Sequence, residues 1–290
     1  MVDNRAMRQA LSLRHFLLAL AVVAVWGTNF VVIKLALGQI PPLLFATLRF
    51  AVVVVPTVFF LPRPKVPWRN LAAYGLLIGV GQFGLLFIAM NGHISPGLAS
   101  LVIQVQVFFT IGLAMRLAGE QLQRMQWLAL ALASAGIGII VLHTDGSTTL
   151  LGLALILLAA LAWAGGNIVA REAGRVNMVA YVVWSSLFAV PPLAALSWWF
   201  EGWDAVAAGL RGADAVVWAA VAWQAWGNSL FGYAAWGWLL ARYPAATITP
   251  MALLVPLFGM GAAALVLGGL ALNLLWPKWR QWLRQRPVAN

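Results

Sequence analysis

Two tryptophan–asparagine pairs stand inside long apolar stretches of the sequence. Asn29 follows Trp26 by three residues and Asn167 follows Trp163 by four, so each pair shares one face of a helix. Polar side chains in such stretches are costly to bury and are therefore candidates for function. The two pairs would supply two aromatic walls and two amides at matching positions. The alternative is structural, with each asparagine hydrogen-bonding a neighbouring helix.

Other amides and one hydroxyl also lie within apolar stretches. An amide donates and accepts hydrogen bonds, so it can bind both the ammonium and the carboxylate of a zwitterion. For any one of these residues, hydrogen bonding between helices is the competing interpretation. Spacing puts Ser100 and Gln104 on one helix face, with Gln106 pointing elsewhere. The candidates of this kind are Gln82, Ser100, Gln104, Gln224 and Asn228.

Arg49 is the cation predicted to lie deepest. It stands eight residues inside an apolar stretch, about 12 Å along a helix. Its planar fork suits a carboxylate, and bonding to helix-end carbonyls is an equally good alternative. All seven acidic residues and all three histidines fall at ends of apolar stretches or in loops. The sequence therefore predicts no intramembrane carboxylate relay, no catalytic or metal-binding constellation and no cofactor.

The elements that position these residues follow from composition. The 290-residue chain is 63% hydrophobic and 9% charged, with a mean hydropathy of +0.91 and no cysteine. A soluble domain carries about 25% charged residues, so the composition excludes a soluble fold and a disulfide scaffold. The net charge of +11 would suggest nucleic acid in a soluble protein, but here the basic residues are few and dispersed. We expect an all-α integral membrane protein with no nucleic-acid partner.

The apolar stretches predict the membrane spans and their orientation. Fifteen of the 18 basic residues fall on one side if the stretches alternate, which puts both termini in the cytoplasm. Cytoplasmic termini need an even number of spans. Eight spans are clear and a further apolar stretch follows them, so ten spans are expected. The eight stretches are 15–37, 42–61, 71–90, 97–115, 127–142, 150–170, 178–199 and 215–241, and a last one covers 244–276.

An internal repeat explains the number ten. AVWGTNFVV at 24–32 resembles LAWAGGNIVA at 161–170, and SPGLASLVIQVQVFF at 95–109 resembles YPAATITPMALLVPLF at 243–258. Five spans in each copy give the copies opposite orientations, an arrangement typical of transporters with a midplane site. The second copy is about 15 residues shorter, so the turn between spans nine and ten is predicted to be missing, by deletion or omission. The expected units are 1–143, 144–277 and a basic cytoplasmic tail, 278–290.

At this level the chain resembles the EamA type of the drug/metabolite transporter superfamily. The resemblance rests on VVAVWGTNFVVIKLAL at 22–37, PPLLFATLRF at 41–50, PGLASLVIQVQVFFTI at 96–111, WAGGNIVARE at 163–172 and LLVPLFGMGAAALVLG at 253–268. Within the family it is most similar to cysteine and O-acetylserine exporters, and also similar to aromatic amino-acid exporters. One departure is that the glycine–glutamate turn after span nine is absent. The resemblance implies a ten-helix inner-membrane exporter with a central cavity between the halves.

The expected activity is export of zwitterionic amino acids and related metabolites by alternating access. The partners are a small-molecule substrate and the lipid bilayer, and the chain is expected to act as a monomer and not as an enzyme. The alternatives are an exporter of drugs or other metabolites, and a membrane scaffold that transports nothing. The resemblance extends to small multidrug pumps that rely on an intramembrane glutamate, and the lack of one here disfavours proton-coupled export of cationic drugs.

Overall fold

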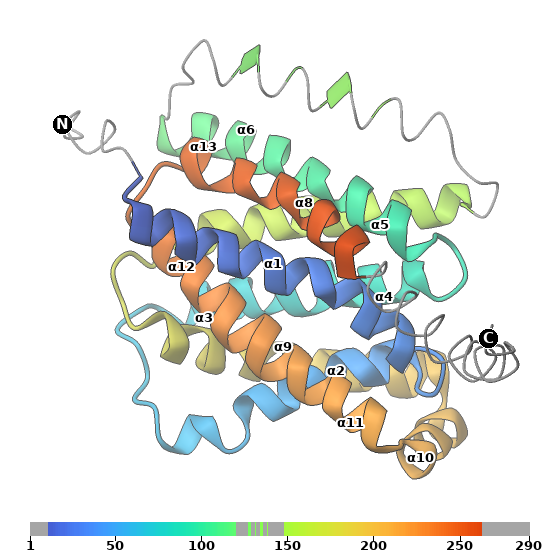
Figure 1. The fold of residues 1–290 in the computed structure, drawn as a ribbon. Helices are drawn as coiled ribbons and strands as arrows, with labels where there is room; N and C mark the ends of the chain where they lie inside the picture. The colour runs from blue at the N-terminus through green and yellow to red at the C-terminus, as the bar shows by residue number, and fades with distance from the viewer. Residues whose placement is uncertain are drawn as a thin grey trace, which may run out of the picture.

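The computed structural model describes residues 11–119 and 148–262, together with a few single positions between 127 and 138. Regular structure in these residues is entirely helical, which confirms the all-α prediction (Figure 1). Three predictions lie outside the described residues: most of the span over 127–142, the tenth span with its missing turn, and the tail 278–290.

The first half of the chain supplies four of the described helical rods. Pro42 and Pro96 occupy first turns, where a missing N–H costs nothing. The elements are α1 (Leu13–Ala36), α2 (Pro42–Val54), η2 (Thr57–Phe59), α3 (Trp68–Gly75), η3 (Leu76–Gly84), α4 (Leu85–Met90), α5 (Pro96–Val102), η4 (Ile103–Val105) and α6 (Gln106–Ala118).

The second half begins its helices with side-chain caps. The Asn177 side chain accepts hydrogen bonds from two N–H groups of α9, at 3.1 and 3.2 Å, and Thr149 caps α8 in the same way. The elements are α8 (Leu150–Glu172), α9 (Met178–Glu201), α10 (Trp203–Gly212), α11 (Ala215–Ala222), η5 (Trp223–Tyr233), α12 (Ala234–Leu240), α13 (Ala245–Ile248) and η6 (Thr249–Leu254).

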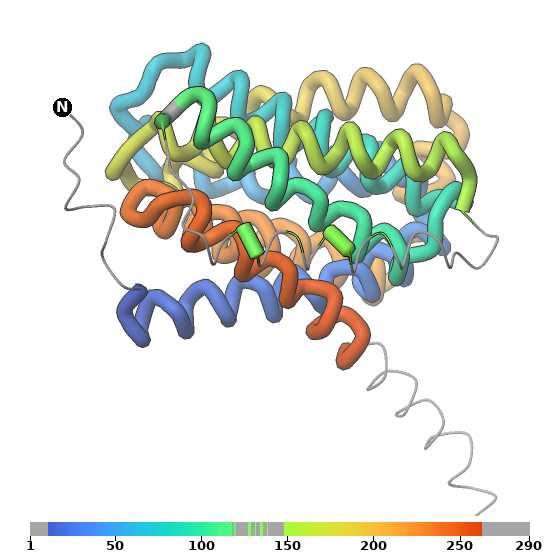
Figure 2. The backbone as a smooth tube through the Cα atoms, turned by 90° about the horizontal axis from the view of Figure 1, so that it is seen from above, coloured from blue at the N-terminus to red at the C-terminus, as the bar shows by residue number. Residues whose placement is uncertain are grey.

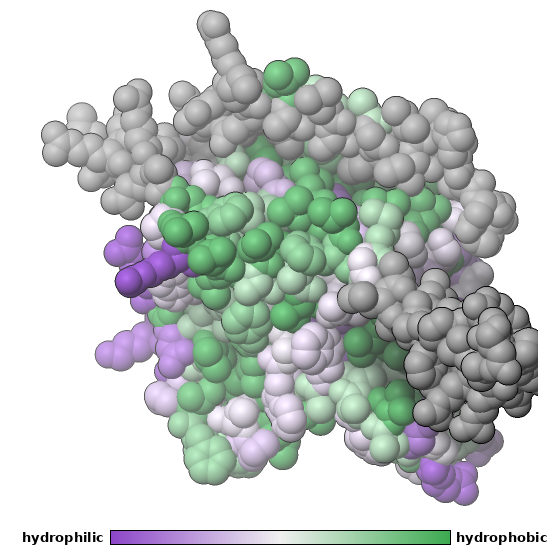
Figure 3. Space-filling view, in the orientation of Figure 1, coloured by the Kyte–Doolittle hydropathy of each residue, from purple (hydrophilic) through white to green (hydrophobic). Residues whose placement is uncertain are grey.

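In the described part of the chain, seven helical stretches are long and apolar enough to cross a membrane. An eighth is possible if α10 and the helix over Ala215–Leu240, which meet at a 102° bend, count as one span. Most of the long helices run roughly along one direction and α10 lies across one end of the bundle (Figures 1 and 2). Apolar residues cover the middle of the visible face, and hydrophilic residues gather at its left and lower right (Figure 3). The protein is thus built as a multi-pass membrane protein.

The two ends of the bundle differ in charge. The end where α1 begins, called the N-terminal end below, also carries the η2–α3, α8–α9 and α12–α13 connections. Eight described basic residues and the acid Glu172 lie at this end, whereas the opposite end carries Lys34 and Arg211 and the acids Glu201, Asp204 and Asp214. The eight are Arg14, Arg63, Lys65, Arg69, Arg116, Arg171, Arg175 and Arg242.

Glu201 joins two helices at the opposite end. Its carboxylate accepts hydrogen bonds from the backbone N–H groups of Leu43 (2.5 Å) and Leu44 (3.0 Å), which are free because they lie in the first turn of α2. The Ser197 hydroxyl donates to the same carboxylate at 2.6 Å. The last residue of α9 therefore caps α2, and a negative charge there is also favourable for the helix dipole.

Glycines let α3 and η3 approach α9 closely. Gly75 lies against the backbone carbonyl of Ser185, and Gly79 lies against the Cβ of Ala189, so a side chain at either glycine would overlap its neighbour. The pair has the four-residue spacing of small residues at membrane helix contacts. The helices are therefore closely packed at this glycine pair.

Two of the long rods contain π-helical segments. These are η3, between α3 and α4, and η5, between α11 and α12. Three others contain short 3₁₀ segments: η2 follows α2, η4 follows α5, and η6 follows α13. Such interruptions often mark functional positions, since they redirect side chains along a helix. Both π segments lie in the middle of the bundle, where the candidate residues are found.

Candidate functional site

Every polar and aromatic residue that the sequence singles out is buried. None of the ten is more than 5% exposed, and Arg49 and Gln224 are fully buried. Both halves of the chain contribute to this buried set, because its members come from α1, α2, η3, α5, η4, α8 and η5. The ten are Trp26, Asn29, Arg49, Gln82, Ser100, Gln104, Trp163, Asn167, Gln224 and Asn228.

Arg49 on α2 is held by three side chains of η5. Its Nε donates to Ser229 Oγ at 2.8 Å, Nη1 to Gln224 Oε1 at 2.8 Å, and Nη2 to Asn228 Oδ1 at 2.7 Å. The Phe83 ring of η3 covers the guanidinium, with Cζ 3.5 Å from the ring centroid. Neutral groups alone make these contacts, so the charge is solvated by dipoles and a ring face instead of by an acid. Of the two alternatives for Arg49, bonding to helix-end carbonyls is not observed among the described residues, and pairing with a substrate carboxylate stays a prediction.

The π geometry of η5 makes this arrangement possible. In a regular α-helix, Ser229 would point about 140° away from Gln224. In η5 the Ser229 hydroxyl reaches the carbonyl of Gln224, five residues back, at 3.0 Å. The wider turn brings residues four and five apart onto one side. Gln224, Asn228 and Ser229 can therefore all face Arg49.

Further hydrogen bonds tie η5 to the first half of the chain. The Tyr233 hydroxyl donates to Gln82 Oε1 at 2.9 Å, which connects η5 to η3. The Gln224 amide donates to Asn29 Oδ1, and the Trp26 indole N–H donates to the backbone carbonyl of Asn228 at 3.4 Å. These bonds join α1, η3 and η5 across the middle of the bundle.

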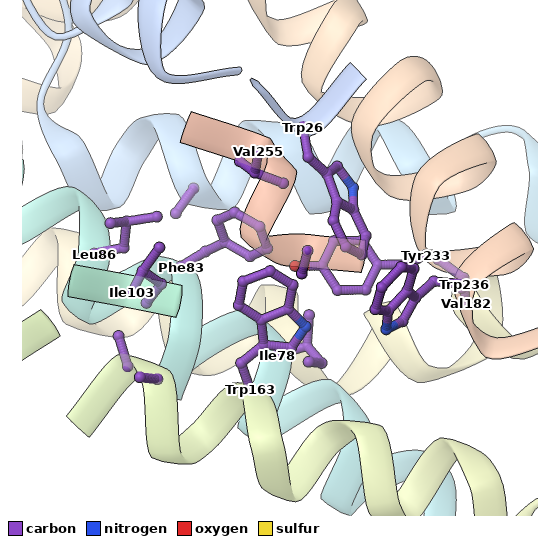
Figure 4. Close-up of a cluster of buried hydrophobic side chains, with 14 of the residues drawn as sticks. Trp26, Ile78, Phe83, Leu86, Ile103, Trp163, Val182, Tyr233, Trp236 and Val255 are labelled. Carbon is purple, nitrogen blue, oxygen red and sulfur yellow. The ribbon is translucent and has the colours of Figure 1, made fainter. Parts of the chain in front are cut away.

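Four large rings pack together beside these bonds (Figure 4). The centroid of Trp26 lies 5.2 Å from that of Trp163, 5.0 Å from Tyr233 and 4.9 Å from Trp236. The two tryptophans that the sequence pairs with asparagines thus meet edge to face. We call Trp26, Trp163, Tyr233 and Trp236 the aromatic cluster.

A small cavity opens beside the aromatic cluster. Its volume is about 20 Å³, enough for one or two water molecules. Six of the ten predicted residues line it: Trp26, Asn29, Gln82, Gln104, Trp163 and Asn228. The remaining wall is Phe83, Tyr233 and an apolar group formed by Phe30, Leu86, Ile103 and Val255.

Three polar atoms of this lining have no hydrogen-bond partner in the part of the chain that the structure describes. They are Gln104 Oε1, Trp163 Nε1 and Asn228 Nδ2. One is an acceptor and two are donors. Buried polar groups are normally paired, so each needs an explanation.

The other four predicted residues lie away from the lining. Arg49 and Gln224 form the network behind Asn228. Ser100 bonds within its own helix, where its hydroxyl donates to the carbonyl of Gly97 at 2.7 Å. Asn167 donates to Gln106 Oε1 at 3.2 Å and to Thr110 at 3.1 Å, both on α6. Asn29 and Asn167 therefore share a position in the sequence pattern but not an environment.

Gln106 does not share the surroundings of Gln104. Gln104 lines the cavity, whereas the fully buried Gln106 accepts a hydrogen bond from Asn167 of α8 and lies outside the lining. The sequence analysis likewise has Gln106 pointing elsewhere than Ser100 and Gln104. Hydrogen bonding between helices is what its side chain does in the structure.

Tyr233, Phe83 and Ser229 are the site residues that the sequence analysis does not identify. The sequence does contain a signal for the segments around Phe83 and Tyr233. The dipeptides Phe83–Gly84 and Phe231–Gly232 lie at the same distance before the aligned prolines, Pro96 and Pro244. Extending the repeat to this dipeptide would have paired η3 with η5. Among the described residues no cluster of histidine and acidic side chains could hold a metal ion.

Comparisons with known proteins agree with this architecture. The sequence model of the EamA-like transporter family matches residues 13–142 and again 150–275. The chain is 42% identical over 257 residues to a Salmonella typhimurium protein named "Probable amino-acid metabolite efflux pump", covering 87% of this chain and 86% of that one. A protein of Escherichia coli K12 with the same name is 40% identical, covering 89% and 88%.

More distant matches agree as well. The "Uncharacterized inner membrane transporter YedA" of Escherichia coli K12 is 31% identical over 60% of each chain. A solved crystal structure superposes with a TM-score of 0.65 at 18% identity, over 91% of this chain and 97% of that one, which shows a shared fold.

Proposed function

Because the chain belongs to the EamA-like transporter family, we propose that it exports amino acids and related metabolites across the bacterial inner membrane through the central cavity. The relatives named as probable efflux pumps for amino-acid metabolites support the substrate class. The observation that carries the proposal is a cavity bounded by α1, η3, η4, α8 and η5, lined by buried amides and aromatic rings. Small-molecule sites are commonly apolar with a few such polar groups.

The proposed architecture has ten helices in two inverted repeats. The two family matches, one in each half, support a duplication. Helix irregularities support the same pairing, because η3 and η5 precede η4 and η6 in the same order. Five spans in each copy would invert the second copy relative to the first. The basic N-terminal end would face the cytoplasm by the positive-inside rule.

The size of the cavity supports alternating access as the proposed mechanism. A volume of about 20 Å³ holds one or two waters and no amino acid, so the walls must separate for a substrate to enter. The walls come from both halves, so a rocking of one half against the other would open the cavity to each side in turn. Trp26, Asn29, Gln82, Gln104, Trp163 and Asn228 would contact the substrate, and the other four predicted residues would position them.

Counterflow in proteoliposomes tests the function. Liposomes containing the purified protein, a monomer by our proposal, are loaded with one unlabelled amino acid, and uptake of labelled cysteine, threonine, leucine or phenylalanine is followed. Trans-stimulation by cysteine and O-acetylserine alone would support a narrow exporter. Stimulation by many neutral amino acids would support a broader one. If correctly folded protein shows no stimulation by any amino acid, the amino-acid assignment fails, and export of drugs or a scaffold role becomes the better interpretation.

A further inference from the structure

The unpaired atoms of the cavity form a complementary set. Gln104 Oε1 lies on η4, Trp163 Nε1 on α8 and Asn228 Nδ2 on η5. Their residues are only 1 to 4% exposed. Leaving such groups without hydrogen bonds is unfavourable. A ligand that bonds to all three atoms therefore gains more binding free energy than one that bonds to none of them.

The hydrogen bonds already made decide what each residue can offer. Asn228 Oδ1 accepts from Arg49 Nη2 at 2.7 Å, so the Nδ2 hydrogens are what this amide presents to a ligand. Gln104 Nε2 donates to the carbonyl of Ser100 at 3.1 Å, so Oε1 is what that amide presents. The cavity therefore offers two N–H donors and one amide oxygen.

Charge favours an anion at the Asn228 end. Arg49 is bonded directly to the amide whose N–H groups face the ligand, and neutral groups alone accept its hydrogen bonds. Its field favours a negative group beside Asn228. Gln104 Oε1, the lone acceptor of the set, suits an ammonium group.

Four apolar residues of the lining bear on the side chain of the ligand. Phe30, Leu86, Ile103 and Val255 present only carbon atoms to the cavity. A charged or strongly polar side chain there would be desolvated without a partner. An aliphatic or aromatic side chain would not.

Building on the proposed function, we infer that the cavity selectively binds α-amino acids with apolar side chains. Trp163 Nε1 and Asn228 Nδ2 donate to the carboxylate, Gln104 Oε1 accepts from the ammonium, and the side chain lies against the four apolar residues. Arg49 acts through Asn228 as a positioning residue. Acidic and basic amino acids are rejected.

Matched tryptophan variants test the carboxylate contact. Trp163→Phe removes an unpaired N–H that lines the cavity, whereas Trp236→Phe removes an equally unpaired N–H from the same aromatic cluster but outside the lining. Leucine counterflow gives the half-saturating concentration. Competition with leucine methyl ester, which has no free carboxylate, measures recognition without that group. For leucine, Trp163→Phe should raise the half-saturating concentration about tenfold or more, as expected for a hydrogen bond to a charged group. Trp236→Phe should leave it unchanged, and inhibition by the ester should be the same in all three proteins.

Asn228→Asp provides an independent test in which the Arg49 bond is retained. The new carboxylate still accepts from Arg49 but repels the substrate carboxylate, so leucine transport should fall at least about tenfold, while inhibition by the matching amine, isoamylamine, should strengthen. The inference is overturned if both tryptophan variants lose leucine transport equally, or if Asn228→Asp transports leucine normally. Absence of amino-acid counterflow in the wild-type protein would instead overturn the proposed function, and this inference with it.

Discussion

The contact between Arg49 and Phe83 makes a prediction that can be measured without a transport assay. The guanidinium lies 3.5 Å from the ring centroid in a buried site, where a cation–π interaction contributes about 2 kcal/mol. Phe83→Leu removes the ring and this contribution. Phe87→Leu, one helical turn later, is the matched control, because Phe87 is also buried but stacks on Phe45 instead of a cation.

We expect Phe83→Leu to lower the melting temperature by about 4 °C more than Phe87→Leu, since 1 kcal/mol corresponds to about 2 °C in a protein of this size. Melting of the detergent-solubilised protein can be followed by intrinsic fluorescence, because the chain contains 16 tryptophans.

A double-mutant cycle separates the cation from general packing. In an Arg49→Met background the extra loss caused by Phe83→Leu should disappear, because there is no cation for the ring to cover. The reasoning is refuted if the two phenylalanine variants melt at the same temperature, or if their difference persists in the Arg49→Met background.

Three further results are expected. Gly75→Val should abolish or strongly reduce folded protein, because the new Cβ would overlap a backbone carbonyl of α9. Gly97→Ala, which has open space around it, should melt like wild type. If the Gly75→Val and Gly97→Ala proteins melt at the same temperature, the described packing is contradicted. Hydrogen bonds from the Val217 backbone and the Gln39 side chain hold the pKa of Asp214 below its usual 3.8, so this stabilisation is complete above pH 3.8 and is lost as the pH falls further. Asp214→Asn should accordingly reduce the fall in melting temperature at acid pH. An unchanged fall would contradict this role of the Asp214 carboxylate. The bond from Tyr233 to Gln82 joins η5 to η3, and we expect it to hold these two walls of the cavity together. Tyr233→Phe removes this bond of about 1 kcal/mol, so labelling of Leu86→Cys, the cavity residue used as reporter, from the N-terminal end should rise about fivefold. A labelling rate equal to that of the Leu86→Cys protein with Tyr233 intact would disprove this expectation.

The composition and burial of the site could be predicted from the sequence. Apolar stretches interrupted by Asn29, Arg49 or Gln224 require these side chains to face other helices, since lipid cannot pair with them. All ten predicted residues are buried for that reason. The repeat places Trp26 and Trp163 at matching positions, and the contact between their rings is what the structure adds.

Partners and faces could not be predicted in the same way. The sequence analysis counts residues at a constant 3.6 per turn, but η4 and η5 depart from that period. Ser229 was not assigned at all, because it lies in such an irregular segment. Local propensity hardly distinguishes a π turn from an α turn, so these segments depend on tertiary contacts such as the Arg49 bonds.

The Arg49 network also constrains how the protein is made. Arg49 and its three hydrogen-bond partners are separated by 175 to 180 residues, so about 10 to 35 s of synthesis pass before the ribosome has made those partners. During this time a helix with a bare arginine costs about 2.5 to 3.5 kcal/mol to hold in lipid. We expect this cost to make insertion of the nascent α2 less favourable until η5 has been made. A chain truncated before η5 should therefore leave α2 incompletely inserted, which makes membrane integration of the first half dependent on translation of the second.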